Sequence, residues 1–365
     1  MKIVILLSML GMNCILCGFE TGFKDIDKRA FVVAVGVDKP KEGKNEYSVS
    51  LKIAIPSSDA STQDKSYVIT EEAKSITEAI RVLKSKTDRE LDFGHTKAII
   101  FGSDVVKKDL RKVMDWFMRR RDVQKVAYVA IGKPYAKTVL QVKPKDENIP
   151  ANSLFLYFGD AGTETPYIST NYLFNFYRSL CDRGIDGYLP IIDVHKNSFF
   201  INTVSVFKGN KEALILSQDE TKTFNAIQSN NKKVDIKVEQ GSLSFMVTTQ
   251  MFKSDFSMKE ANKNKPVIQL KTNIKGTVEE STDTLDDKQL EKYGKLASKT
   301  SEKRIRNLLT KFKDNRVDPL GFGLMYRASR VGSEDQKWEK WKRIYPDIQF
   351  NIEVETTIKG TGIIK

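Results

Sequence analysis

Cys14 and Cys17 are the first residues in the sequence that could do chemistry, because their Cys-x-x-Cys spacing is the one that redox pairs and zinc sites use. A redox pair needs a strand-to-helix context, and a structural zinc ion needs two further ligands. The third cysteine, Cys181, lies far along the chain, and the two histidines, His95 and His195, are isolated. We therefore expect neither a redox site nor a metal site here.

The residues in front of this pair have the layout of an export signal. A nearly continuous apolar run from Ile3 to Leu16 follows the cation Lys2, as an apolar h-region follows a charged n-region. A membrane-spanning helix needs about 20 apolar residues, and this run has roughly 14. A cysteine that closes such a run is the site at which bacterial lipoprotein processing attaches a diacylglyceryl group. Two acyl chains suffice for stable anchoring, so we predict lipidation at Cys17 and a signal peptide at residues 1–16.

Leu16 departs from the usual processing pattern, in which a small residue precedes the lipidated cysteine. Two alternatives therefore stay open for the N-terminus. Either Cys14 carries the lipid, or the signal is cleaved conventionally or not at all.

The composition is that of a basic globular protein. Of 365 residues, 40% are apolar, and the formal net charge is +13. A basic body fits nucleic acid or an anionic membrane surface. The cations are scattered among 47 acidic residues, and their densest clusters, Arg119 to Arg121 and Lys303 with Arg304, lie in predicted amphipathic helices. We therefore expect no nucleic-acid partner.

The elements that position these residues alternate in the first half of the chain. Short apolar runs bounded by turn residues predict strands, while a capping box at residues 75–78 and the cap residues Ser103 and Asp104 predict helices. Residues 57–66 are expected to form a loop, and residues 134–184 to be mainly helical. The strands are expected at residues 30–38, 47–56, 95–102 and 125–132.

The second half has longer elements. A helix is expected at residues 285–316, and a shorter one carries Trp338 and Trp341 on one face. Residues 218–232 are expected to be a linker or a short helix. The apolar seam of the long helix comprises Leu290, Tyr293, Ala297, Leu308 and Phe312, interrupted by Ser301. The strands are expected at residues 198–207, 211–216, 233–239, 242–252, 266–279 and 348–360.

This succession predicts an α+β or mixed α/β fold in which each domain is a β-sheet packed with helices. A chain of this length is long for a single core. We expect three domains after the signal peptide: an N-terminal α/β domain at residues 17–190, a middle domain at 191–258, and a C-terminal domain at 259–365 that holds the long helix and the final strand.

Sequence motifs of common catalytic sites are missing. The chain has no Gly-x-Ser-x-Gly elbow, no Gly-x₄-Gly-Lys-Ser/Thr loop and no His-Glu-x-x-His pair. Neither His95 nor His195 lies in a recognisable nucleophile context. We therefore expect no enzyme, no catalytic residue and no cofactor.

Several stretches, taken in order, resemble the Ger(x)C family, the lipoprotein C subunits of nutrient germinant receptors in endospore-forming bacteria. Together they span nearly the whole chain. The matching stretches are DIDKRAFVVAVGVD (25–38), LDFGHTKAIIFG (91–102), GYLPIIDV (187–194), VSVFKGNKEALILSQDETKTFNAI (204–227), DPLGFGLMYR (318–327) and KWEKW (337–341).

The resemblance implies a non-enzymatic lipoprotein that is anchored in the bilayer through Cys17 at the outer face of the spore inner membrane. It also implies two partners, the A and B membrane subunits of a germinant receptor, with which the C subunit couples nutrient sensing to spore germination. For the signature residues we expect structural reasons: close packing at Gly36, a helix cap or kink at Gly321 and Gly323, and apolar area from Trp338 and Trp341.

Two rival functions stay open. The first is a lipoprotein solute-binding protein that captures a small ligand in a cleft between two lobes. The second is a secreted hydrolase, whose activity replacement of His95 and His195 should abolish.

Overall fold

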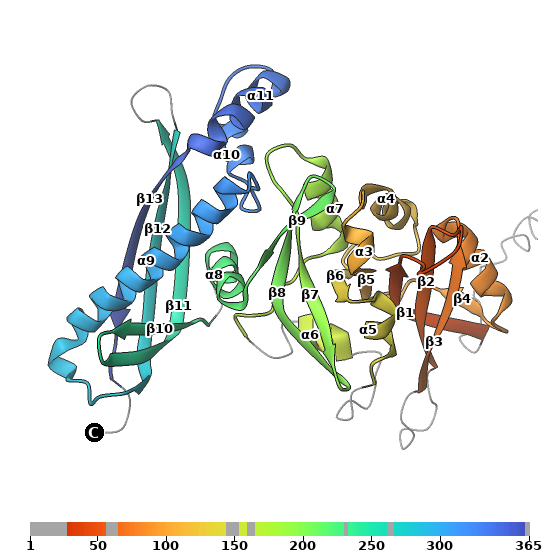
Figure 1. Cartoon of the computed structure of the whole chain (residues 1–365), viewed down its shortest axis with the longest axis horizontal. Helices are drawn as coiled ribbons and strands as arrows, with labels where there is room; N and C mark the ends of the chain where they lie inside the picture. Colours follow the sequence, from red (N-terminus) through yellow and green to blue (C-terminus); the bar gives the residue numbers. More distant parts are fainter. Residues whose placement is uncertain are drawn as a thin grey trace, which may run out of the picture.

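The computed structural model describes residues 28–55, 65–143, 153–158, 165–229, 233–260 and 266–361. The predicted signal peptide, Cys14 and Cys17 lie outside these residues. The described residues form two β-sheets that lie next to each other along the longest axis of the molecule (Figure 1).

The N-terminal sheet is mixed, with strand order β3-β2-β1-β5-β6-β7-β8-β9 and the short β4 paired with β1. Its central strands β1, β5, β6 and β7 run parallel, while antiparallel hairpins extend both edges. The strands are β1 (Arg29–Asp38), β2 (Tyr47–Ile55), β3 (Lys65–Ala73), β4 (Glu90–Asp92), β5 (Ala98–Gly102), β6 (Tyr128–Lys133), β7 (Tyr188–His195), β8 (Ser198–Lys208) and β9 (Lys211–Leu216).

Helices cover both faces of this sheet. One apolar cluster joins one face to α2 (Ile76–Ser85), α3 (Ser103–Val106), α4 (Arg111–Arg119) and α7 (Leu173–Cys181). A second cluster joins the other face to α5 (Ala136–Gln141) and α6 (Ser153–Phe158). Every residue of β5 is buried, as expected for a strand of a parallel sheet that is covered on both sides.

The C-terminal sheet has four strands in the order β10-β11-β12-β13. Residues of β12 alternate between buried and more exposed positions, because the long helix α9 packs on one face of the sheet (Figure 1). The elements are α8 (Gln218–Ser229), β10 (Asp235–Gln240), β11 (Leu243–Glu260), β12 (Pro266–Ser281), η2 (Asp287–Gln289), α9 (Leu290–Asp314), α10 (Phe322–Ala328), α11 (Glu334–Ile344), η3 (Tyr345–Asp347) and β13 (Gln349–Ile358).

The predicted seam of the long helix is confirmed. Tyr293, Ala297, Leu308 and Phe312 are buried in one cluster, and Leu290 packs partly buried against it. Ser301, which interrupts the seam in the sequence, is itself buried. The helix begins at Leu290 rather than at residue 285, because the 3₁₀ turn η2 precedes it.

Two expectations about local structure need correction, and one pair of open alternatives is decided. Lys65 and Ser66, the last two residues of the predicted loop at 57–66, belong to β3 instead. β3 is an edge strand that includes Glu71 and Glu72, so it lacks the apolar pattern of an inner strand. The mainly helical stretch at 134–184 contains only short helices among its described residues. Residues 218–229 form a helix, the second of the two expected alternatives.

The predicted domain boundaries at residues 190 and 258 fall within β7 and β11. The described residues build two sheets, each packed with helices, so the predicted α+β fold class is confirmed. The division into three domains remains a prediction, because strand membership alone does not define an independently folding unit.

Candidate functional site

The structure places the sequence-predicted residues in separate surroundings. His95 follows β4, with its ring 4.7 Å from that of Phe31 and its Nδ1 3.8 Å from Asp92. His195 ends β7 and packs edge-on against Phe200. Within the described residues, no three His, Cys, Asp or Glu side chains lie close enough together to hold a metal ion.

The family-like motif at residues 25–38 has a structural role. The Asp38 carboxylate accepts hydrogen bonds from the backbone nitrogens of Ala136 (2.7 Å) and Lys137 (2.8 Å) at the start of α5. A Cβ atom on Gly36 would lie 3.1 Å from that of Ala136, so glycine lets the helix approach the strand. Burial raises the pKa of Asp38 above its usual range.

Hydrogen bonds to backbone groups also join the two sheets to each other. The segment between α7 and β7 meets the segment between α9 and α10 through backbone hydrogen bonds from Asp186 to Asp318 (2.9 Å) and from Leu324 to Gly184 (2.9 Å). The backbone nitrogen of Asp318 also donates to the Asp186 carboxylate at 2.8 Å. We call these two segments, residues 182–187 and 317–324, the junction.

Two buried carboxylates hold the junction together. The Asp318 oxygens accept from the backbone nitrogens of Phe322 (3.0 Å) and Gly323 (2.7 Å), which start α10. Asp186 accepts from Lys208 Nζ (3.1 Å) and the backbone nitrogen of Gly209 (3.2 Å). Burial raises the pKa of Asp318 to about 7, and the nearby Asp186 adds to the rise. These carboxylates cap backbone groups, an arrangement that positions the chain.

Glycines allow the two segments to touch. Gly321 has a φ of 75°, a left-handed conformation that favours glycine, at the N-cap of α10. A Cβ atom on Gly323 would lie 2.6 Å from both the Cα of Gly184 and the Nε1 of Trp341. The expected helix cap is thus present at Gly321, whereas Gly323, for which a cap or kink was also expected, allows close packing instead. Trp341 is buried here, whereas Trp338 packs partly buried against the same cluster.

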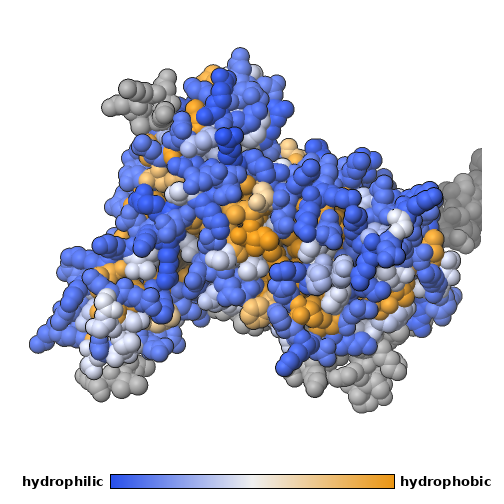
Figure 2. All heavy atoms as spheres, viewed as in Figure 1, coloured by the Kyte–Doolittle hydropathy of each residue, from blue (hydrophilic) through white to orange (hydrophobic). Residues whose placement is uncertain are grey.

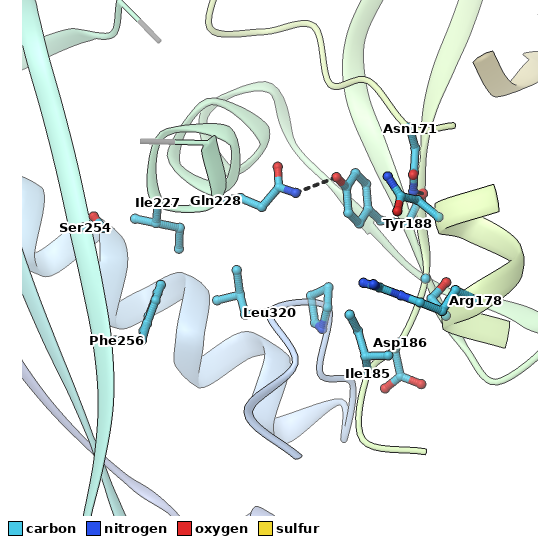
Figure 3. Close-up of a pocket in the computed structure, with 14 residues that line it drawn as sticks. Asn171, Arg178, Ile185, Asp186, Tyr188, Ile227, Gln228, Ser254, Phe256 and Leu320 are labelled. Atoms are coloured by element: carbon cyan, nitrogen blue, oxygen red, sulfur yellow. Dashed lines mark hydrogen bonds between the residues drawn. The ribbon is translucent and has the colours of Figure 1, made fainter. Parts of the chain in front are cut away.

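Residues of the segment from 184 to 187 line two cavities. One, of about 300 Å³, opens between α7, β7, α8 and β11 (Figure 3). The other, of about 490 Å³, is lined by both tryptophans, by Cys181 and by charged side chains of both signs. Figure 2 shows apolar surface gathered in the hollow between the two halves of the molecule.

The smaller cavity combines one cation with amides and an apolar wall. Arg178 extends its guanidinium from α7 into the space between the halves (Figure 3). The Asn171 side-chain nitrogen donates to the Tyr188 carbonyl at 2.9 Å, and that of Gln228 donates to the Tyr188 hydroxyl at 2.7 Å. Ile227, Phe256 and Leu320 form part of the opposite side. The lining residues of this cavity thus come from both halves of the molecule.

Sequence reasoning did not find the junction. Asp318 belongs to the family-like stretch DPLGFGLMYR, and Arg178 lies in the stretch at 134–184 that was expected to be mainly helical; no pattern singled out either residue. The signal available was the clustering of Asp and Gly in GIDGY (184–188) and DPLGFG (318–323), since these residues cap helices and allow backbones to approach. Their contact across more than a hundred residues could not be deduced from either stretch alone.

None of the helices in the described ranges combines the length and apolar character that crossing a bilayer requires. Residues 22–194 match the family model described as spore germination protein N-terminal domain. Residues 202–362 match the model described as spore germination B3/GerAC like, C-terminal. The two matches follow each other along almost the whole chain.

Two relatives from Bacillus subtilis (strain 168) align over nearly their full lengths. A YfkR protein, provisionally named as a spore germination protein, is 23% identical over 96% of this chain and 95% of the relative. Spore germination protein KC is 24% identical over 93% of this chain and 91% of the relative.

The crystal structure of the GerBC protein superposes with a TM-score of 0.57 and 15% identity, over 92% of this chain and all of that chain. The identity is low, so this likeness speaks for the fold. The two family models and the relatives agree with it along the same residues. The chain therefore belongs to the Ger(x)C family of spore germination proteins.

Proposed function

We propose that this protein is a lipid-anchored, non-enzymatic subunit of a spore germinant receptor. In this proposal a diacylglyceryl group on Cys17 holds it at the outer face of the spore inner membrane. There it assembles with A and B membrane subunits and couples nutrient sensing to germination.

The observation that carries this proposal is the tandem match of residues 22–194 and 202–362 to the two spore germination models. The matched body starts a few residues after the predicted lipidation site, so a lipid on Cys17 would place the folded part close to the bilayer surface. Two acyl chains give an anchor that does not depend on a spanning helix.

The chemistry of the junction fits a role in assembly rather than in turnover. Asp186 accepts hydrogen bonds from the backbone nitrogens of Gly209 and Asp318, which lie in other segments of the chain, and Asp318 accepts one from Gly323 in its own segment. Carboxylates that are used in this way fix the position of neighbouring segments, whereas a general acid or base must reach a substrate proton. Such a rigid body suits a subunit that acts by contacting its neighbours.

Detergent-phase partitioning and mass spectrometry of the native protein test the anchor. We expect the mature chain to begin at Cys17, to carry the mass of a diacylglyceryl group and to enter the detergent phase. Cys17→Ala should leave the protein unprocessed and without this added mass, while the matched variant Cys14→Ala should behave as the wild type does. A lipid mass that persists in Cys17→Ala and disappears in Cys14→Ala would move the anchor to Cys14.

Assembly is tested by purification of the tagged, lipidated protein from spore membranes. We expect two multi-span membrane proteins to co-purify in constant ratio. Recovery of the lipidated protein without them, under conditions that preserve other membrane complexes, would contradict the receptor proposal while leaving the anchor intact.

A further inference from the structure

We propose that the cavity between the two halves binds a small organic carboxylate with an apolar body, and that Arg178 pairs with its carboxylate. The proposal concerns direct ligand binding by this subunit. This proposal does not depend on the lipid anchor or on the partner subunits.

Arg178 supplies the charge. It lies on α7, three residues after Asn175, so these two side chains share a helix face, and both line the cavity together with Ser179. Its Nε lies 3.9 Å from Asp182, and its guanidinium extends toward Leu320 across the cavity (Figure 3). A guanidinium matches a carboxylate with two parallel hydrogen bonds, which favours this anion over a neutral group of the same shape.

The nearest buried acid does not neutralise Arg178. Both oxygens of Asp186 accept other hydrogen bonds, from the backbone nitrogens of Gly209 and Asp318 and from Lys208. Figure 3 shows the Asp186 carboxylate directed away from the Arg178 guanidinium. Arg178 pairs through its Nε with the half-exposed Asp182 at 3.9 Å, a long contact that leaves the end of the guanidinium directed into the cavity.

The amides beside Arg178 are held in fixed positions. Asn171 and Gln228 both donate to Tyr188, one to its carbonyl and the other to its hydroxyl. Tyr188 itself is buried, and its ring lies 4.9 Å from that of Phe224 on α8. A rigid polar edge next to the cation can orient the polar end of a ligand without ordering mobile side chains.

The opposite wall comes from the other half of the molecule and is apolar apart from Ser254. Ile227 belongs to α8, Phe256 to β11, and Leu320 to the segment before α10. The Phe256 ring packs against Phe322 at 5.3 Å, which fixes this wall to the junction. An apolar body would bury its surface here while the carboxylate reaches Arg178, and a volume of about 300 Å³ limits it to a small molecule.

The larger cavity on the other side of the junction differs in how its charges are paired. Its lining includes Arg183, Lys208, Arg316 and Lys342, but also Asp182, Asp186 and Asp318. Arg183 pairs with Asp335, Lys342 with Glu339 and Lys208 with Asp186. Among the described residues, the one cation in the lining of the smaller cavity, Arg178, makes a long contact of 3.9 Å with Asp182, so the smaller cavity is the one that we assign to an anion.

A ligand in this position would contact α7 and β7 on one side and α8, β11 and the residues before α10 on the other. Its binding energy would therefore add to the contacts that hold the two halves together. The smaller cavity is in this way a site where a small molecule can change how firmly the two sheets are joined.

The test uses the full-length chain in deuterated detergent, 3-phenylpropanoate as probe, and saturation-transfer difference NMR titration, which detects millimolar affinity. We expect the probe to bind in the millimolar range and its primary amide, 3-phenylpropanamide, to bind at least ten-fold more weakly. Arg178→Gln should weaken binding of the carboxylate at least ten-fold and leave binding of the amide unchanged. Arg178 is exposed, so its replacement should not impair folding.

Arg119→Gln is the matched control, since Arg119 is likewise an exposed arginine of a helix on the same sheet; it should bind the probe as the wild type does. Leu320→Gln should weaken binding several-fold through the apolar wall. Equal binding of the carboxylate and the amide, binding that survives Arg178→Gln, or no binding at the highest soluble concentration would each overturn the proposal.

Discussion

Strand β5 of the N-terminal sheet is buried along its whole length, whereas β12 of the C-terminal sheet alternates between buried and more exposed residues. The first sheet is covered by helices on both faces and holds two separate apolar clusters. The second sheet depends on a single cluster, which is completed by α9. The N-terminal half is therefore layered on both faces of its sheet, and the C-terminal half has most of its core on one side.

The single C-terminal cluster also extends beyond its own sheet. It includes Tyr188 from β7 and Val204 and Val206 from β8, which belong to the N-terminal sheet. Helix α8 makes this connection: the Phe224 ring lies 4.9 Å from Tyr188 and 5.9 Å from Phe312 of α9. The two sheets differ in architecture, but α8 gives them a continuous core, so we expect the described body to unfold as one unit.

Phe224→Ala gives the strongest test of this continuity. Removing a fully buried phenylalanine costs about 3–5 kcal/mol of unfolding free energy, and Phe224 is fully buried between the two halves. We expect denaturant unfolding, followed by circular dichroism and tryptophan fluorescence, to change from one transition to two. Tryptophan fluorescence follows both halves, because Trp116 lies in the N-terminal half and Trp338 and Trp341 lie in the C-terminal half.

Phe101→Ala is the matched control within the N-terminal core. Phe101 is also fully buried, and it packs against Phe117 at 6.0 Å, far from α8. A similar loss of stability is expected, with a single transition retained. If Phe224→Ala also unfolds in one transition, then the halves are joined chiefly through the polar junction rather than through α8.

The second largest expected effect is a dependence of the unfolding free energy on pH, which comes from Asp318 at the polar junction. Burial raises its pKa from 3.8 to about 7 in the folded protein, so between these pH values the folded state holds a proton that the unfolded state has released. Stability therefore falls as pH rises through this window, by a few kcal/mol at most. Asp318→Asn cannot titrate and should flatten this part of the curve of unfolding free energy against pH.

The exposed Asp314 at the end of α9 provides the control for this measurement. Asp314→Asn should leave the slope between pH 4 and pH 7 as it is in the wild type. An unchanged slope in Asp318→Asn would mean that this carboxylate stays ionised at the junction throughout that range.

Much of the fold could be predicted from the sequence. Apolar runs such as residues 30–38 and the spacing of Tyr293, Ala297 and Phe312 indicated the central strands and the long helix, because burial imposes these periods on the sequence. β3 was missed, since an edge strand with Glu71 and Glu72 has no such pattern. Apolar runs and alternation thus identified the edge strands β9, β10 and β13 as well as most inner strands, but they identified neither β3 nor the inner strand β7.

The candidate site was not predictable to the same extent. Asp186 and Asp318 are separated by more than a hundred residues, and their contact depends on how the two sheets pack. Arg178 can be recognised as a candidate binding residue only from the fold, which places Leu320 and Ile227 across the cavity from it. Local periodicity in the sequence predicts which residues are buried, but it does not predict which buried segments contact each other.

The smallest expected effect comes from the ion pair that links α8 to α9. Lys311 Nζ donates to both oxygens of Glu220, at 2.8 and 2.7 Å, and both side chains are partly exposed. Burial raises the pKa of Glu220, but hydrogen bonds from Lys311 and Ser217 outweigh it and bring the pKa below its usual range. The pair therefore stabilises the fold above the pKa of the unfolded chain and loses its effect as the pH falls through the lower, folded value.

Lys311→Met keeps the apolar stem of the side chain and removes its charge, so it should lower the unfolding free energy at neutral pH by about 0.5–1 kcal/mol. The loss should disappear in acid, when Glu220 is protonated. Lys295→Met breaks an ion pair with Glu291 on the fully exposed face of the same helix and should have no measurable effect. Because Lys311 connects two helices and Lys295 only one, equal losses in the two variants would show that α8 and α9 are held together by their apolar contacts alone.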